Sequence, residues 1–293
     1  MEVIVVDQSD VPFNPFEEVS LPEGWEAVFV HRTVKNVSVA RNVGIALSRH
    51  DLLLFLDDDM EALPGFLRQH LEAHMAPEVA LSTSAILSGQ DKTTIVQDCA
   101  YFPEEEAQAR WPELAEKLQG RLVYHAPSCN MCVKKTVLRT IGLFRECLSI
   151  CEDSELCSRL VTAGLAQVYL EKPLLLHYQT ALGGTREGNR DYFRFSVLQK
   201  RNYCTSWFLF RLYVTGRLPA VWEEFHFYLS NARSTFLNRY SLRPDIFLRS
   251  AWVYFESIGR AQRLYRENPD PPTLEQYAEI VRRECKDVYR KIF

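Results

Sequence analysis

The first part of the chain contains short, uninterrupted runs of apolar residues separated by polar turns. Val3 to Val6 is a β-branched run that stops at Asp7, and residues 28–30 and 52–56 form two more apolar runs. Such runs are typical of strands buried on both faces of a parallel sheet. Between the second and third runs, residues 38–48 place apolar side chains at helical spacing behind a serine N-cap. This order predicts an α/β fold, with a mostly parallel sheet flanked by helices.

The same alternation continues along the chain. Residues 64–75 are expected to form a helix and residues 79–86 a strand, whereas residues 87–130 are less regular. Further strands are expected at 130–133, 168–170 and 174–176, with a helix over 152–164. From residue 190 onward the pattern predicts helices only.

Charge and aromatic content divide the chain near residue 189. The net charge is −4, but residues 1–189 hold 16 basic and 27 acidic side chains, and residues 190–293 hold 18 and 11. The second part also contains 22 of the 35 aromatic residues. We therefore expect an α/β domain over 1–189 and a helical, cationic, aromatic-rich region over 190–293. The small overall charge gives no indication of nucleic-acid binding.

Cysteine usage and the absence of a leader pattern bear on location. No apolar run approaches the roughly eighteen residues of a membrane span, and Met1 is followed by Glu2 rather than by basic residues. The eight cysteines lack the spacing of a disulfide framework. We therefore expect reduced thiols and a cytoplasmic location.

Two of the apolar strands end in carboxylates. Asp7 follows the first, and Asp57, Asp58 and Asp59 follow the run at 52–56. The carboxyl ends of parallel strands form ligand sites, and three adjacent acids repel one another unless a hard cation such as Mg²⁺ or Mn²⁺ offsets the repulsion. The alternative is that some of these acids only cap the next helix.

Five segments provide a more specific signal through their order. They are Val3 to Asp10 (VIVVDQSD), Ala40 to Gly44 (ARNVG), Phe55 to Asp59 (FLDDD), Asn130 to Val133 with Ile141 to Glu146, and Glu152 to Leu156 (EDSEL). In this order they resemble the family 2 glycosyltransferases, which have the GT-A fold and use nucleotide-sugar donors. The likeness covers roughly residues 3–190, and each motif alone is a weak signal.

This resemblance implies a metal-dependent, inverting glycosyltransferase of the hexosyltransferase type, acting in polysaccharide biosynthesis. The donor would be a UDP-, GDP- or dTDP-sugar, and the acceptor a saccharide or a lipid-linked molecule. Mn²⁺ or Mg²⁺ would bind Asp57 and Asp59 of the DxD motif together with His177. Asp57 or Asp58 would lie nearer the ribose or the water shell of the metal. His177 follows an apolar run, and a histidine there is also compatible with an ordinary, partly buried residue.

The resemblance also assigns residues to the nucleotide and to catalysis. Asp7 would hydrogen-bond the base, Arg41 would contact the nucleotide, and Arg186, in a loop that begins at Gly183, would reach the diphosphate. Without the ARNVG motif around it, Arg41 is equally well explained as part of a surface ion pair. Arg186 is equally well explained as part of a plain surface turn. Asp153 would be the catalytic base, although an acid at a helix start is also a common cap.

Two features leave alternatives open. Family members usually begin with a strand and a helix before the segment that Val3 opens here. This departure predicts an unpaired apolar strand edge and favours, as a second hypothesis, a non-catalytic GT-A-like binding or assembly subunit.

The aromatic helices after residue 190 are compatible with a core, with a homodimer interface, or with peripheral contact at the inner face of the membrane.

Overall fold

The computed structural model describes residues 1–117, 121–178, 197–218 and 244–293, and these form two compact units. The first comprises Met1–Arg145, Leu156–Thr180 and Pro271–Phe293, and the second comprises Glu146–Glu155 and Ala181–Asp270. Residue 186 lies outside the described residues, so the expectation for Arg186 is not addressed. The two units are described separately below.

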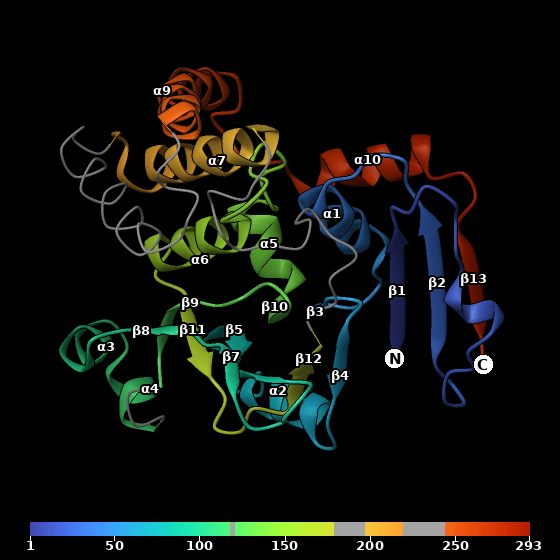
Figure 1. Ribbon diagram of the computed structural model, residues 1–293. Helices are drawn as coiled ribbons and strands as arrows, with labels where there is room; N and C mark the ends of the chain where they lie inside the picture. Colours follow the sequence, from blue (N-terminus) through green and yellow to red (C-terminus); the bar gives the residue numbers. More distant parts are fainter. Residues whose placement is uncertain (118–120, 179–196, 219–243) are drawn as a thin grey trace. The chain divides into compact units, whose positions relative to one another are not determined.

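The first unit opens with a three-stranded sheet that joins the two ends of the chain (Figure 1). β1 (Glu2–Asp7) is parallel to β2 (Glu26–His31), and β13 (Tyr289–Ile292) is antiparallel to β2 on its other side. Helices only were expected after residue 190, and β13 corrects this. Arg290 holds the strand in place through ion pairs with Glu2 and Glu26, which are partners distant in sequence.

The outer edge of β1 was expected to be unpaired. Within the described residues β1 pairs only with β2, because the C-terminal strand adds to the far side of β2 instead. Helix α1 (Val37–Leu47) packs beside this sheet, and Ile4 and Val6 contribute to the main core. The N-cap of α1 is Asn36, whose side chain accepts a hydrogen bond from the amide of Val39, and not the serine expected from the pattern.

Two four-stranded sheets carry the rest of the unit. One has the order β11 (Ala166–Tyr169), β5 (Val79–Thr83), β10 (Asn130–Lys134) and β3 (Leu52–Leu56), and the other has the order β4 (Met60–Ala62), β12 (Leu175–His177), β6 (Ile86–Ser88) and β7 (Ile95–Gln97). The α/β fold is confirmed, but antiparallel pairs such as β10 with β3 and β5 outnumber parallel ones. The expectation of a mostly parallel sheet is therefore wrong. A strand covered on both faces is uniformly apolar whichever way its neighbours run.

Helices cover this unit and complete its core. The main core lies among β2, β3, β5, β10, α1, α5 (Lys135–Ile141), α6 (Glu152–Thr162) and α10 (Leu274–Glu284). The remaining elements are η1 (Pro15–Glu17), α2 (Phe66–Ala73), β8 (Ala100–Tyr101), α3 (Glu104–Arg110), α4 (Pro112–Lys117) and β9 (Val123–His125). Leu156, Cys157 and Leu160 fix α6 in the core, and the guanidinium of Arg159 donates to the carbonyls of Ile141, Gly142 and Leu143.

A buried amide locks α1 to the segment after α5. Asn42 is fully buried, its Nδ2 donates to the Phe144 carbonyl at 2.8 Å, and its Oδ1 accepts from the Phe144 amide at 3.0 Å. We expect Asn42→Ala to lower the free energy of unfolding by about 2–5 kcal/mol, because both main-chain groups of Phe144 lose their partner inside the core. Urea denaturation measures this. A loss no larger than that of Ser158→Ala, at a half-buried position on α6, would contradict it.

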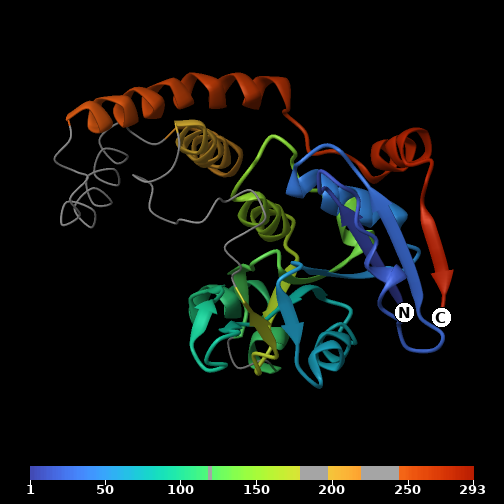
Figure 2. The same ribbon diagram turned by 45° about the vertical axis from the view of Figure 1, so that its right-hand side comes forward.

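The second unit contains a helical pair. α7 (Val197–Thr215) packs on α9 (Pro244–Glu267), and the two helices lie side by side in both views (Figure 2). The contact is made by Cys204, Phe208, Leu209, Leu212 and Ala261, joined by Leu148. Phe208 meets Tyr254 edge-to-face with ring centroids 5.0 Å apart. Aromatic residues thus form a core in this part of the chain.

Two observations bear on the expected location. Among the described helices, none combines the length and apolar character that crossing a bilayer requires. All eight cysteines lie within the described residues, where they are present as thiols.

Candidate functional site

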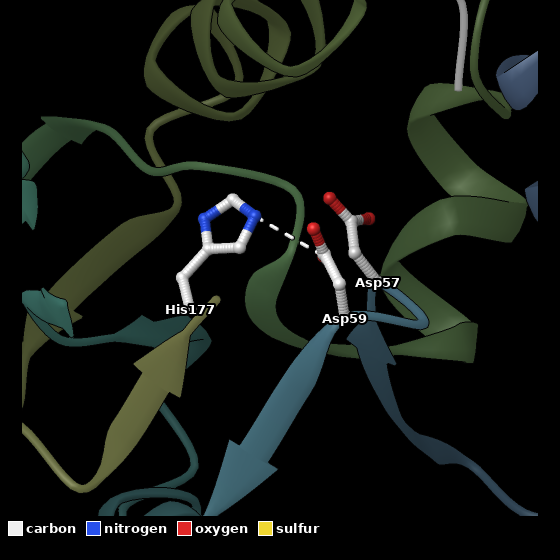
Figure 3. Close-up of side chains that lie close together, drawn as sticks. All are labelled: Asp57, Asp59 and His177. Atoms are coloured by element: carbon white, nitrogen blue, oxygen red, sulfur yellow. Dashed lines mark ion pairs between the residues drawn. The ribbon is translucent and has the colours of Figure 1, made fainter. Parts of the chain in front are cut away.

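Pairing of two short strands brings an aspartate and a histidine together. Asp59 immediately precedes β4, and His177 is the last residue of β12, where it lies opposite Met60. The amide of Tyr178 donates to the carbonyl of Asp59 at 3.0 Å and closes the end of this ladder. As a result, His177 Nε2 lies 3.1 Å from Asp59 Oδ1 (Figure 3).

Asp57 completes a set of three candidate metal ligands, Asp57, Asp59 and His177, which we call the metal group. One atom each from Asp57, Asp59 and His177 lie within 4.8 Å of one another. Ligands about 2.1 Å from an octahedral ion are about 3.0 Å apart when adjacent and about 4.2 Å apart when opposite. Two carboxylates and one imidazole gathered within 4.8 Å are therefore able to supply ligands to a divalent cation such as Mn²⁺ or Mg²⁺. The side chain of Asp58 is exposed and lies outside the group.

The electrostatics of the group favour a bound cation. Burial raises the pKa of Asp57, and the charges of Asp59 and Asp58 raise it further, whereas nearby Arg41 and His177 act in the opposite direction. A divalent ion relieves this crowding of negative charge by replacing repulsion with attraction. Within the described residues, His177 Nδ1 is buried and has no hydrogen-bond partner.

Arg41 lies beside Asp57. Its Nη2 is 3.6 Å from Asp57 Oδ1, and its Cζ lies 5.5 Å from the centre of the Phe144 ring. The Arg41 side chain is 11% exposed and that of Asp57 is 41% exposed, so the structure shows an ion pair here, and the contact of Arg41 with a nucleotide stays a prediction. α1 therefore presents a guanidinium next to the metal group, where it is able to meet an anionic ligand.

Asp7 organises the turn that follows β1. Its carboxylate accepts hydrogen bonds from the amide of Ser9 at 3.0 Å, the hydroxyl of Ser9 at 2.6 Å and the amide of Phe13 at 3.1 Å. Burial acts to raise the pKa of Asp7, but the hydrogen bonds from Ser9 and Phe13 outweigh it and the pKa is lowered. The structure thus gives Asp7 a local structural role, and its contact with a nucleobase stays a prediction.

Asp7→Ala should loosen this turn in a pH-dependent way. The lowered pKa means that the ionised carboxylate stabilises the folded state above the unfolded-state pKa of about 4, and that this contribution is lost as the pH falls. We expect a loss of about 1 kcal/mol at pH 7 that shrinks as the pH falls below about 4. Paired urea titrations of variant and wild type at several pH values measure it. A pH-independent difference would exclude the carboxylate as its source.

Asp153 lies in the second unit, as the second residue of α6. Its Oδ1 accepts from the Ser154 amide at 2.7 Å, and the residue is half-buried. Cys151, just before the helix, has a positive φ of 63°, which is uncommon for a residue other than glycine. Since Asp153 and the metal group belong to different units, its catalytic role is taken up below as a proposal.

Three residues beside the metal group were not anticipated from the sequence. Tyr178 contacts both Glu61 and Gly89, and the Gly89 amide donates to the carbonyl of His177 at the end of β12. Tyr178 directly follows the candidate histidine, and Gly89 follows a short strand. These two positions can be read from the sequence, but only the pairing of the strands shows that Tyr178 and Gly89 lie against each other.

Comparisons with known proteins agree with the motif order. Residues 1–142 match the model of a family described as Glycosyl transferase family 2. Two curated relatives, both named "Pre-mycofactocin glycosyltransferase" and from Mycobacterium tuberculosis strains CDC 1551 and H37Rv, are 30% identical over 182 residues. The match covers 60% of this chain, but the chain spans only 37% of the length of those relatives.

A solved structure is also similar at low identity. The structure of GalNAc-T7 with UDP, GalNAc and Mn²⁺ aligns with a TM-score of 0.47 at 12% sequence identity, covering 97% of this chain and 51% of that one.

Proposed function

Because residues 1–142 match the model of glycosyl transferase family 2, we propose that the protein transfers a sugar from a nucleoside-diphosphate sugar to a saccharide or lipid-linked acceptor, with inversion. The observation that carries the proposal is the convergence of Asp57, Asp59 and His177. These side chains come from two segments more than a hundred residues apart, and they form the donor set that a diphosphate-binding metal site needs.

The metal group would bind Mn²⁺ or Mg²⁺ through two carboxylates and one imidazole. When bound, such an ion supplies fixed positive charge against the charge that develops on the departing diphosphate. Asp59 and His177, whose side chains are 16% and 12% exposed, would hold the inner side, and the more exposed Asp57 would face the ligand.

Asp153 is proposed to act as the base. Its carboxylate would take the proton of the acceptor hydroxyl as that oxygen forms a bond to the anomeric carbon. The bond between this carbon and the diphosphate oxygen breaks in the same step, and the electron pair leaves with the nucleoside diphosphate. A single displacement inverts the anomeric centre.

The nucleotide would be held by residues around the same strand ends. Arg41 would contact the nucleotide through its guanidinium, which lies beside Asp57. Asp58 would contact the ribose through its exposed carboxylate. Asp7 would contact the base from the turn that it organises, and Arg186 would reach the diphosphate. The donor would be a UDP-, GDP- or dTDP-sugar.

On the acceptor side we propose a cytoplasmic reaction in polysaccharide biosynthesis. In the second unit, Trp252 and Phe255 of α9 are 72% and 58% exposed on a helix that also bears arginines. Such a surface is suited to contact with a second copy of the chain or with the inner face of a membrane that holds a lipid-linked acceptor.

Calorimetric titration tests the proposal. Each of the three donor types is titrated into the purified protein with and without Mn²⁺, and we expect saturable binding of one donor that depends on the ion. The inactive UMP, GMP and dTMP serve as controls for binding through the base alone. A non-catalytic binding or assembly subunit, the alternative, would show no metal-dependent donor binding and would overturn the proposal.

A further inference from the structure

Among the described residues, no hydrogen bond fixes the Nδ1 side of the His177 ring, whereas Nε2 faces Asp59 Oδ1 at 3.1 Å. A metal-binding imidazole usually donates its other N–H to a carboxylate, carbonyl or water, and this partner sets the tautomer and the ring direction. In the part of the chain that the structure describes, His177 Nδ1 is buried and has no such partner. The position of the imidazole therefore depends on its contact with Asp59 and on how rigidly the main chain at the end of β12 is held.

Tyr178 ties that end to β4 at two points. Its amide donates to the carbonyl of Asp59 at 3.0 Å, and its hydroxyl donates to the carboxylate of Glu61. Asp59 is itself a candidate ligand, and Glu61 pairs with Leu176, the residue before His177. Tyr178 therefore bonds the residues before and after Met60, and Met60 is the residue that pairs with His177.

Gly89 lies against the Tyr178 ring and is hydrogen-bonded to His177. The Gly89 amide donates to the carbonyl of His177 at 2.9 Å, so the last residue of β12 is also fixed to the segment after β6. A Cβ atom added at Gly89 would lie only 2.6–2.8 Å from atoms of the Tyr178 ring. The Tyr178 ring therefore lies directly against the main chain of Gly89. Any residue with a Cβ atom at position 89 would collide with the ring in this position.

We propose that Tyr178 is a positioning residue for the metal site. By resting on Gly89 and bonding Glu61, it holds His177 at the distance from Asp57 and Asp59 that a divalent ion requires. This inference rests on the proposed function, because it assigns a role toward the ion that the three ligands would bind. Tyr178 itself is not one of the three candidate ligands.

The test compares Mn²⁺ affinity among variants by electron paramagnetic resonance of the free ion. Tyr178→Ala removes both ring and hydroxyl, and we expect its affinity to fall about 10–30-fold, within the range seen when groups supporting metal ligands are lost. Tyr178→Phe keeps the ring on Gly89 and should stay within about threefold of wild type. Gly89→Ala keeps the tyrosine but displaces its ring, and should weaken binding about fivefold or more.

A matched control and a second readout separate positioning from general stability. Tyr124→Ala removes a tyrosine of similar exposure, 47% against 40%, outside the metal group, and should leave Mn²⁺ affinity unchanged. Melting temperatures of the metal-free variants are measured in parallel. If Tyr178→Ala loses affinity only in proportion to a lowered melting temperature, while Gly89→Ala binds normally, the role is merely structural and the inference is overturned.

The outcomes also distinguish this inference from the proposed function. Wild-type protein that binds Mn²⁺, with Tyr178→Ala binding equally well, overturns the positioning role and leaves the function intact. Wild-type protein that does not bind Mn²⁺ at all overturns the proposed function and the inference with it. Weaker binding by Tyr178→Ala and Gly89→Ala, with recovery in Tyr178→Phe, supports both.

Discussion

Asp59→Ala is expected to abolish Mn²⁺-dependent donor binding and to reduce sugar transfer about 1,000-fold or more. Asp59 lies 3.1 Å from His177, and its loss removes one of the two carboxylates of the group, which are the ligands that a hard cation prefers. Without the ion, charge on the departing diphosphate is not met by a fixed cation, and a 1,000-fold loss corresponds to about 4 kcal/mol of transition-state stabilisation.

Thermal unfolding with and without Mn²⁺ gives an independent check on Asp59. A ligand that binds only the folded state raises the melting temperature, so Mn²⁺ should stabilise the wild type and have no effect on Asp59→Ala. Glu72→Ala, which removes an exposed acid from α2 of the same unit, is the control and should respond to Mn²⁺ as the wild type does. Equal stabilisation of Asp59→Ala by Mn²⁺ would show that the ion binds elsewhere.

Asp153→Asn is expected to lower kcat about 1,000-fold while donor affinity stays within about twofold. The amide keeps the shape of the side chain and an oxygen able to accept from the Ser154 amide, but it is not able to take a proton from the acceptor. Positioned general bases contribute about 100-fold to 10,000-fold to rate. Steady-state kinetics combined with donor titration separates these two quantities.

The alternative for Asp153, a helix-start acid that only stabilises α6, makes a different prediction. It requires a lower melting temperature and an unchanged kcat per folded molecule. Glu267→Gln, which neutralises an exposed acid at the end of α9 in the same unit, serves as the control for charge. Wild-type kcat in Asp153→Asn would remove this residue from the mechanism.

Local pattern was a good guide where burial alone decides structure. The runs at Val3–Val6 and Leu52–Leu56 are strands, and the helix expected at 38–48 is α1, Val37–Leu47. Pattern was a poor guide where a distant partner decides. Tyr289–Ile292 is too polar to look like a strand, and it becomes one because β2 offers a free edge and Glu2 and Glu26 receive Arg290.

The sequence by itself determined the α/β class, the resemblance to glycosyl transferase family 2 and the aspartates at the end of β3, because these depend on short-range periodicity and on motif order. Only the tertiary structure decided that His177 meets Asp59, that Asn42 holds Phe144, and that Tyr178 rests on Gly89. Each of these contacts joins segments far apart in the chain. Their geometry is set by strand pairing and close packing, which no local pattern encodes.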